Sequence, residues 1–268
     1  MAGRLALVFV FACAAPVRAG GVLEASAQAT VGDRVVLRLD VRNSGERPLS
    51  AVTPEVVYDG RSERGETLSD LAAGARHSWT FDLPRPAEPG TIPAVIHVRY
   101  TGGDGRQAAL PVVATVSTPG LLPVPEVRAT LTSSPVTRFA RAVLLLENPL
   151  PAPVHGRVVV VLPDGLTIEP ESQPAEVAAE GRSEVPLVVQ NRGEPPGVPV
   201  PVFALFEYEQ SGRRHLAVAS ASADVVGGSS PLPPLAVGGG ALGVALALLA
   251  VAWRRAARRA ALDRHPAS

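Results

Sequence analysis

The sequence contains no lysine, only one cysteine and few aromatic residues. All 25 basic residues of the 268-residue chain are therefore arginine, 25 acidic residues balance them, and aromatic residues make up 4%. Glycine and proline, by contrast, number 25 and 27, which is well above their usual share. This composition argues against a helical enzyme core, while the 46% of hydrophobic residues argues against a disordered chain.

The single cysteine, Cys13, lies in an apolar run that is typical of a secretory signal peptide. Arg4 precedes this run and small residues follow it, so we predict a signal peptide over residues 1–19, cleaved between Ala19 and Gly20. A buried N-terminal strand and lipidation at Cys13 are the alternatives. Cleavage would leave no cysteine, and hence no disulfide, in the exported chain. With arginine replacing lysine throughout, the composition suggests a bacterial envelope protein from a GC-rich genome.

An uncharged segment at residues 235–253 predicts a transmembrane helix. Its 19 residues would span about 28 Å as a helix, close to the thickness of a bilayer core. Arginines follow at once, which favours a cytoplasmic tail at 254–268 and a single-pass protein of the cytoplasmic membrane. A buried core helix is one alternative, and a C-terminal sorting signal that is cut and re-anchored is another, although its recognition peptide is missing. The residues that define the anchor and its topology are Trp253, Arg254, Arg255, Arg258 and Arg259.

Two further features bear on partners. Gly239 and Gly243 match the small-xxx-small pattern of helix dimers, so a homodimer through the membrane helix is one hypothesis, and lipid-facing glycines are the alternative. Residues 20–234 carry 18 arginines against 24 acidic residues, a balance that does not favour binding of nucleic acid.

The region between the two apolar ends contains an internal repeat of one unit. Sliding the sequence by 105 to 108 residues brings Asn43 onto Asn148 and Tyr100 onto Tyr208. Chance similarity between two β-rich stretches is the alternative. We predict a first domain over residues 20–118, a linker over 119–126, a second domain over 127–227 and a Pro/Gly/Ser stalk over 228–234.

Each unit shows short alternating strands separated by turn signals, the pattern of a β-sandwich. The predicted fold is all-β, with two tandem immunoglobulin-like β-sandwich domains and one C-terminal transmembrane helix. Hydrophobic residues at every second position mark the faces expected to be buried. These residues are Val35, Leu37, Leu39 and Val41; Trp79, Phe81 and Leu83; Ala94, Ile96, Val98 and Tyr100; and Val202, Ala204, Phe206 and Tyr208.

Several short motifs resemble known bacterial modules. The stretches Val31-Gly32-Asp33, Leu39 to Gly45 and Leu71-Ala72-Ala73-Gly74 resemble immunoglobulin-like modules of the cell-adhesion-related (CARDB) type. In the second unit, Glu147-Asn148-Pro149, Leu162 to Leu166 and Ala179-Glu180-Gly181 are similar to the modules associated with alpha-galactosidases. The resemblance implies spacer, adhesive or positioning modules, here without an attached catalytic domain.

Motifs for nucleophilic, phosphate-binding or metal chemistry are absent from the sequence. The histidines are scattered, and His97 is expected on a solvent-facing side of its strand. Glu207 and Glu209 share a strand face at a spacing of about 7 Å, near that of paired glycosidase carboxylates, but a solvated face explains them as well. Tyr100 and Tyr208 occupy equivalent places, which favours a structural role over sugar binding.

We therefore expect no enzyme and no cofactor. The sequence favours a non-catalytic, membrane-anchored envelope protein that presents two immunoglobulin-like domains, periplasmic or extracellular, to a protein partner for interaction, adhesion or scaffolding. The alternatives are an accessory subunit of an envelope enzyme, transporter or secretion complex, and a carbohydrate-binding module.

Overall fold

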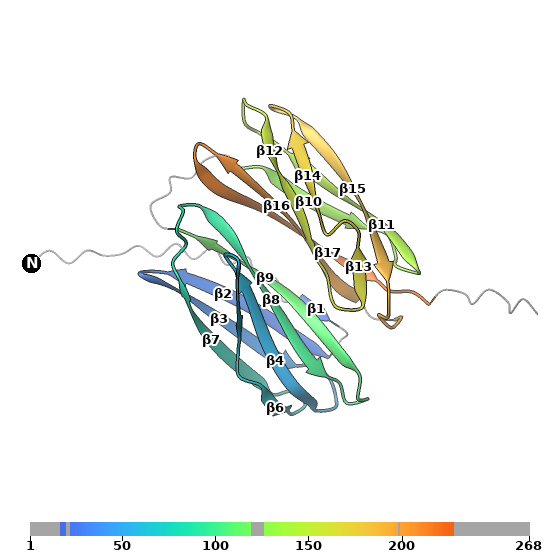
Figure 1. Cartoon of the computed structure of the whole chain (residues 1–268). Helices are drawn as coiled ribbons and strands as arrows, with labels where there is room; N and C mark the ends of the chain where they lie inside the picture. The colour runs from blue at the N-terminus through green and yellow to red at the C-terminus, as the bar shows by residue number, and fades with distance from the viewer. Residues whose placement is uncertain (1–16, 20–21, 119–125, 198, 228–268) are drawn as a thin grey trace, which may run out of the picture. The chain divides into compact units, whose positions relative to one another are not determined.

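The structure is a computed structural model that describes residues 17–19, 22–118, 126–197 and 199–227. Every regular element in this part of the chain is a β-strand (Figure 1). The first half contains β1 (Val17–Ala19), β2 (Leu23–Val31), β3 (Arg34–Asn43), β4 (Leu49–Tyr58), β5 (Arg61–Arg64), β6 (Leu68–Leu71), β7 (Arg76–Pro84), β8 (Thr91–Thr101) and β9 (Gln107–Ser117). The second half contains β10 (Arg128–Ser133), β11 (Phe139–Glu147), β12 (Val154–Val161), β13 (Leu166–Ile168), β14 (Ser172–Val177), β15 (Arg182–Asn191), β16 (Pro199–Gln210) and β17 (Arg213–Asp224).

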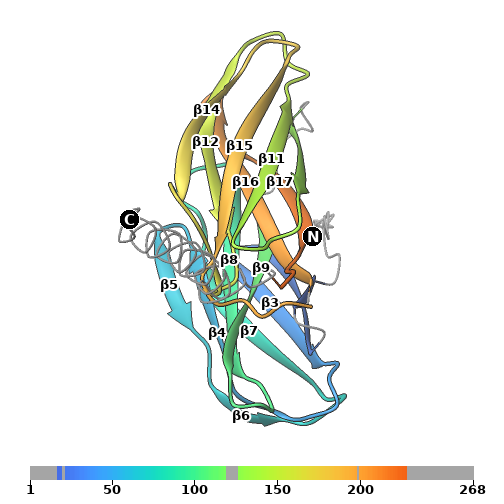
Figure 2. The same cartoon turned by 90° about the vertical axis from the view of Figure 1, so that its right-hand side faces the viewer.

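The strands form four antiparallel sheets that pair into two sandwiches. In the first sandwich the sheet β1-β2-β3-β7 faces the sheet β5-β4-β8-β9, with β6 also paired to β4. In the second, β10-β11-β15-β13 faces β14-β12-β16-β17. Of these strands, Figure 2 labels β11, β12, β14, β15, β16 and β17. The expectation of an all-β, immunoglobulin-like sandwich fold is therefore confirmed for the described residues.

The two sandwiches share one strand order. The run β2-β3-β7 corresponds to β10-β11-β15, and the run β6-β4-β8-β9 corresponds to β14-β12-β16-β17. Each sandwich has its own apolar core, one built from residues between Leu23 and Val116 and the other from residues between Val127 and Val225. The halves of the sequence that align with each other thus fold with the same topology.

The predicted inward faces are buried. Along β3 burial alternates residue by residue, with Val35, Leu37 and Leu39 fully inside. Trp79 on β7 and Tyr100 on β8 are also buried, as the period of two predicts. At about 25 cal/mol for each Å² of apolar surface removed from water, such faces drive the closure of each sandwich.

One corner recurs in both sandwiches and is fixed by an asparagine side chain. Asn43 donates from Nδ2 to the carbonyl oxygens of Arg47 and Leu71, at 2.8 and 2.9 Å, and its Oδ1 accepts from the Gly45 amide. Asn148 donates in the same way to Ala152 and Ala178, both at 2.9 Å. Both asparagines are buried. Their side-chain amides therefore supply the hydrogen bonds that water cannot give to the backbone groups at this corner.

The membrane and signal predictions fall largely outside the described residues. Gly20, the stalk and the membrane helix with its arginines and with Gly239 and Gly243 all lie there, as does the linker except for Glu126. Within the described part of the chain, no helix is long and apolar enough to cross a bilayer. Ala19 ends β1, which pairs with Leu23–Ala25 of β2, so cleavage after Ala19 would uncover that edge of β2.

Candidate functional site at the junction of the sandwiches

The strand β16 is buried on both of its faces from Val200 to Phe206. Val202, Ala204 and Phe206 belong to the core of the second sandwich, as the sequence predicts. Phe203 and Leu205 point to the opposite side, yet they are only 6% and 1% exposed. A sheet face that remained in water would not bury such side chains, so another part of the chain covers it.

The cover is the first sandwich. Phe203, Leu205, Val161 and Leu216 form a separate apolar cluster on the outer face of the sheet β14-β12-β16-β17. Val95 of β8 and Val113 of β9 pack against this cluster, together with Val159 and Val218 of the second sandwich. Because this contact is apolar, it holds the two sandwiches together by the same force that closes each core.

Backbone pairing and an ion pair join the sandwiches beside this cluster. Gly90, just before β8, forms a parallel bridge with Arg214 of β17. Gly90 has a φ of 150°, and a Cβ there would overlap the backbone of Arg214, so the close approach requires glycine. The Arg214 guanidinium then donates from Nη1 to Oδ1 of Asp59, at 2.8 Å.

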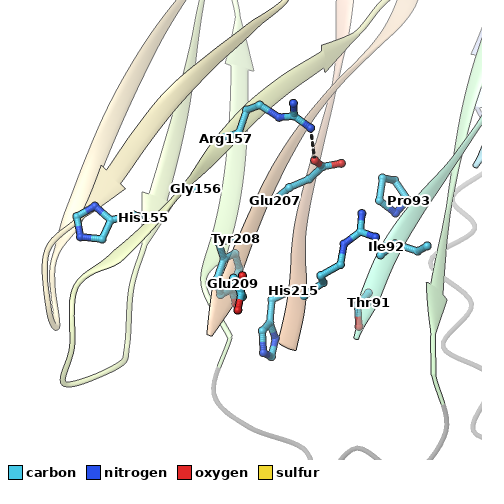
Figure 3. A pocket seen from close by; sticks show the side chains of 11 residues that line it. Thr91, Ile92, Pro93, His155, Gly156, Arg157, Glu207, Tyr208, Glu209 and His215 are labelled. Atoms are coloured by element: carbon cyan, nitrogen blue, oxygen red, sulfur yellow. Dashed lines mark hydrogen bonds and ion pairs between the residues drawn. The ribbon is translucent and has the colours of Figure 1, made fainter. Parts of the chain in front are cut away.

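A cleft of about 250 Å³ opens along this junction, between the start of β8 and the strands β12, β16 and β17 (Figure 3). Arg157 of β12 donates from Nη2 to Oε2 of Glu207 on β16, at 2.9 Å, within the cleft wall. Gly156 forms the adjacent part of the wall, where a Cβ would overlap the Phe206 ring. The charges of Arg157 and Glu207 in the cleft wall therefore neutralise each other.

The two glutamates that the sequence singles out do not form a matched carboxylate pair. Both line the cleft, but Glu207 is engaged by Arg157, whereas Glu209 is exposed and has no ion pair among the described residues. A general acid and base pair needs two carboxyl groups in contrasting environments that both face a substrate. The geometry here fits a solvated strand face better than that chemistry.

A buried histidine closes one end of the cleft. His215 is 7% exposed, and its ring stacks on Tyr208 with centroids 5.1 Å apart. Nδ1 of His215 lies 3.7 Å from Oε1 of Glu126 and has no hydrogen-bond partner among the described residues. The Tyr208 hydroxyl accepts from the Val127 amide, and burial raises the pKa of this tyrosine. Tyr208 and His215 therefore fix the point at which the chain enters the second sandwich.

A polar cluster lies elsewhere on the same junction. Arg99 of β8 donates to Glu55 at 2.9 Å, and its Nε lies 3.9 Å from Oδ2 of Asp164 in the second sandwich. Burial, and next the charge of Asp164, raise the pKa of Glu194. His97, expected on a solvent-facing side, is half-buried here, and that burial lowers its pKa.

The sequence indicates some of the residues that hold the sandwiches together, but not others. The run from Val200 to Phe206 contains no polar residue, a pattern that indicates burial on both faces of a strand. Asp59 and Arg214 are 155 positions apart, and nothing in their local sequence points to their contact. In the described part of the chain, no three His, Cys, Asp or Glu side chains are placed to hold a metal ion.

The chain matches no protein-family model and no curated protein. It is similar in structure to red sea bream transglutaminase, with 16% identity, a TM-score of 0.28, and coverage of 84% of this chain and 32% of that one. Escherichia coli alpha-2-macroglobulin gives 10% identity, a TM-score of 0.31, and coverage of 76% and 17%. A Porphyromonas gingivalis protein of unknown function gives 18% identity, a TM-score of 0.26, and coverage of 75% of this chain and 100% of that one. The chain thus spans a third or less of the first two proteins, and likenesses this distant identify no activity.

Proposed function

We propose that the protein is a non-catalytic, membrane-anchored envelope protein whose two sandwiches act as a single arm that presents a binding surface to a protein partner outside the cytoplasmic membrane. The observation that carries this proposal is the apolar junction, in which Leu205 is 1% exposed and packs with Phe203 against the first sandwich. A spacer or scaffold needs domains held in a fixed relation. Independent domains on a flexible linker would not bury such a face.

The sequence pattern supplies the rest of the proposal. An apolar N-terminal segment and a 19-residue uncharged segment followed by arginines support export and anchoring in the cytoplasmic membrane. The CARDB-type resemblance supports a role in adhesion or positioning. In the cleft wall Arg157 pairs with Glu207 at 2.9 Å, and this supports the non-catalytic part of the proposal.

Affinity purification of the full chain from its native membranes in mild detergent tests this proposal. We expect one envelope protein to be recovered in a fixed ratio to the chain, and to be cross-linked to it before solubilisation. If that partner is an enzyme or transporter whose activity falls when the chain is deleted, the accessory-subunit alternative is favoured. Recovery of the chain from the cytoplasm without any membrane protein would contradict the proposal.

A further inference from the structure

The described chain leaves the second sandwich beside an unusual group of exposed side chains. Val226 donates its amide to the carbonyl oxygen of Val136, and Val136 donates to that of Asp224, so the exit strand lies against the segment that leads into β11. Arg138 and Phe139 follow two and three residues after Val136. Phe139 is 51% exposed, which is the largest value among the exposed large hydrophobic residues of the described chain.

Arginines surround this phenylalanine. The Arg138 guanidinium carbon lies 5.5 Å from the centre of the Phe139 ring. On the same outer face, Arg141 lies opposite Val188 of β15, which is 47% exposed. Arg192 donates from Nε to the Thr167 hydroxyl. Gln190 of β15 pairs with Phe139 of β11 on one side and with Thr167 of β13 on the other, so the three residues lie in one row across the sheet. We call Arg138, Phe139, Arg141, Val188 and Arg192 the exit patch.

The charge of the exit patch is not neutralised within the described chain. Arg138, Arg141 and Arg192 form no ion pairs there, whereas many other arginines of the two sandwiches do. Glu169 directly follows β13, and Glu184 lies four residues from Val188 along β15, opposite Leu145. The patch therefore combines a net positive charge with exposed apolar groups.

The length of the chain after this point limits how far the patch can stand from a bilayer. Only eight residues, 227–234, separate Val226 from the predicted membrane segment. Even fully extended, they reach about 29 Å. Arginine and exposed phenylalanine are suited to a lipid surface, since the guanidinium binds phosphate and the ring enters the headgroup boundary.

Resting on the proposed membrane anchor, we propose that the exit patch docks on the anionic headgroups of the bilayer in which the chain is anchored, so that the second sandwich lies against the membrane rather than swinging freely above it. The exit patch is thus proposed to bind the lipid surface. If it binds a protein partner instead, the experiment distinguishes the two cases.

The test uses the full chain with Cys13→Ser, reconstituted into vesicles of phosphatidylcholine alone or with 30% phosphatidylglycerol. An environment-sensitive fluorophore is attached at Thr137→Cys, an exposed position next to the exit patch. The matched control carries it at Val36→Cys, an apolar strand residue of the first sandwich that is 43% exposed. Lipids with a nitroxide on the headgroup quench whichever probe lies at the surface.

We expect at least twofold stronger quenching at position 137 than at position 36 in the anionic vesicles, and a smaller difference in phosphatidylcholine alone. Arg138→Gln with Arg141→Gln, or Phe139→Ser, should remove most of the difference. These side chains are exposed, so folding should be retained, which circular dichroism verifies. Equal quenching at both positions in chains that float with the vesicles after alkaline extraction would overturn the docking alone and leave room for a protein partner. Chains that do not float would overturn the anchor, and the docking with it.

Discussion

Arg214 of the second sandwich donates a hydrogen bond to Asp59 of the first, across 155 residues of sequence and 2.8 Å of space. Both side chains are about one-third exposed, so water screens the pair only in part. The pair lies beside the bridge between Gly90 and Arg214, where the backbones of the two sandwiches meet. It is the clearest polar link between two halves that otherwise each have a complete core.

We expect a double-mutant cycle on this pair to show that it couples the sandwiches. Asp59→Asn and Arg214→Gln should each destabilise the chain, and the coupling free energy should be about 0.5–1 kcal/mol. Denaturant unfolding of the full chain in detergent measures it. Arg34 and Asp82, a pair within the first sandwich and more exposed, give the control cycle. A coupling energy of zero between Asp59 and Arg214 would show that the pair does not stabilise the junction.

Truncation of the apolar junction should separate the unfolding of the sandwiches. Leu205→Ala removes buried methyl groups at the contact and is expected to cost about 2–4 kcal/mol. Because the cores themselves remain intact, a single unfolding transition should become two. Val188→Ala, at an exposed site, should change stability by less than about 0.5 kcal/mol. One unchanged transition in the Leu205 variant would indicate that the sandwiches are not coupled there.

The two corner asparagines should have equal importance. Replacing Asn43 or Asn148 by alanine leaves buried backbone carbonyls and an amide without partners, at a cost of about 2–4 kcal/mol in each case. Thermal melts of the two variants measure this cost. Gln107→Ala, at an exposed strand position, is the control and should have little effect. A loss at only one of the two corners would contradict their structural equivalence.

The tyrosines should resist ionisation in the folded chain. Burial raises the pKa of Tyr58 and of Tyr100 to about 12, and it raises the pKa of Tyr208 as well. A raised folded pKa means that the unfolded chain loses its phenolic protons first, so stability is complete below pH 10 and falls as the pH rises toward 12. Absorbance at 295 nm should therefore show little phenolate from Tyr58 and Tyr100 at pH 11, and all three tyrosines ionised when denaturant is added. Full ionisation at pH 10.5 without unfolding would contradict this burial.

Glu194 should make the junction less stable at neutral pH than at acid pH. Its folded pKa is raised by burial, and then by Asp164, so its charged form is disfavoured in the folded chain. The penalty is present above the folded pKa and disappears as the pH falls below the ordinary glutamate value, about 4.3. Glu194→Gln is expected to raise the melting temperature at pH 7 and to have no effect near pH 3.5. An equal gain at both values would point to packing rather than charge.

The sequence predicts the interior of each sandwich well because burial there follows a local period of two. Val35, Leu37 and Leu39 alternate with polar neighbours, and each lies where that alternation places it. The junction is harder to predict, since it depends on which two outer faces meet. The apolar run around Phe203 indicates a second buried face, but no local pattern names Val95 and Val113 as its cover. Phe139 differs in the opposite direction: it is an aromatic residue in an apolar strand, yet it lies exposed at the start of that strand.

Topology labelling of the full chain in intact cells tests the central claim most directly. The Cys13→Ser substitution removes the single native cysteine, so that only the introduced cysteine can be labelled. A cysteine at Thr80, which is exposed on β7, is compared with one at Ala261 in the arginine-rich tail. We predict that a membrane-impermeant maleimide labels Thr80→Cys in intact cells or spheroplasts, and Ala261→Cys only after permeabilisation, with both chains resisting alkaline extraction from membranes. Protection of Thr80→Cys until the cells are lysed would contradict an exported, membrane-anchored pair of sandwiches.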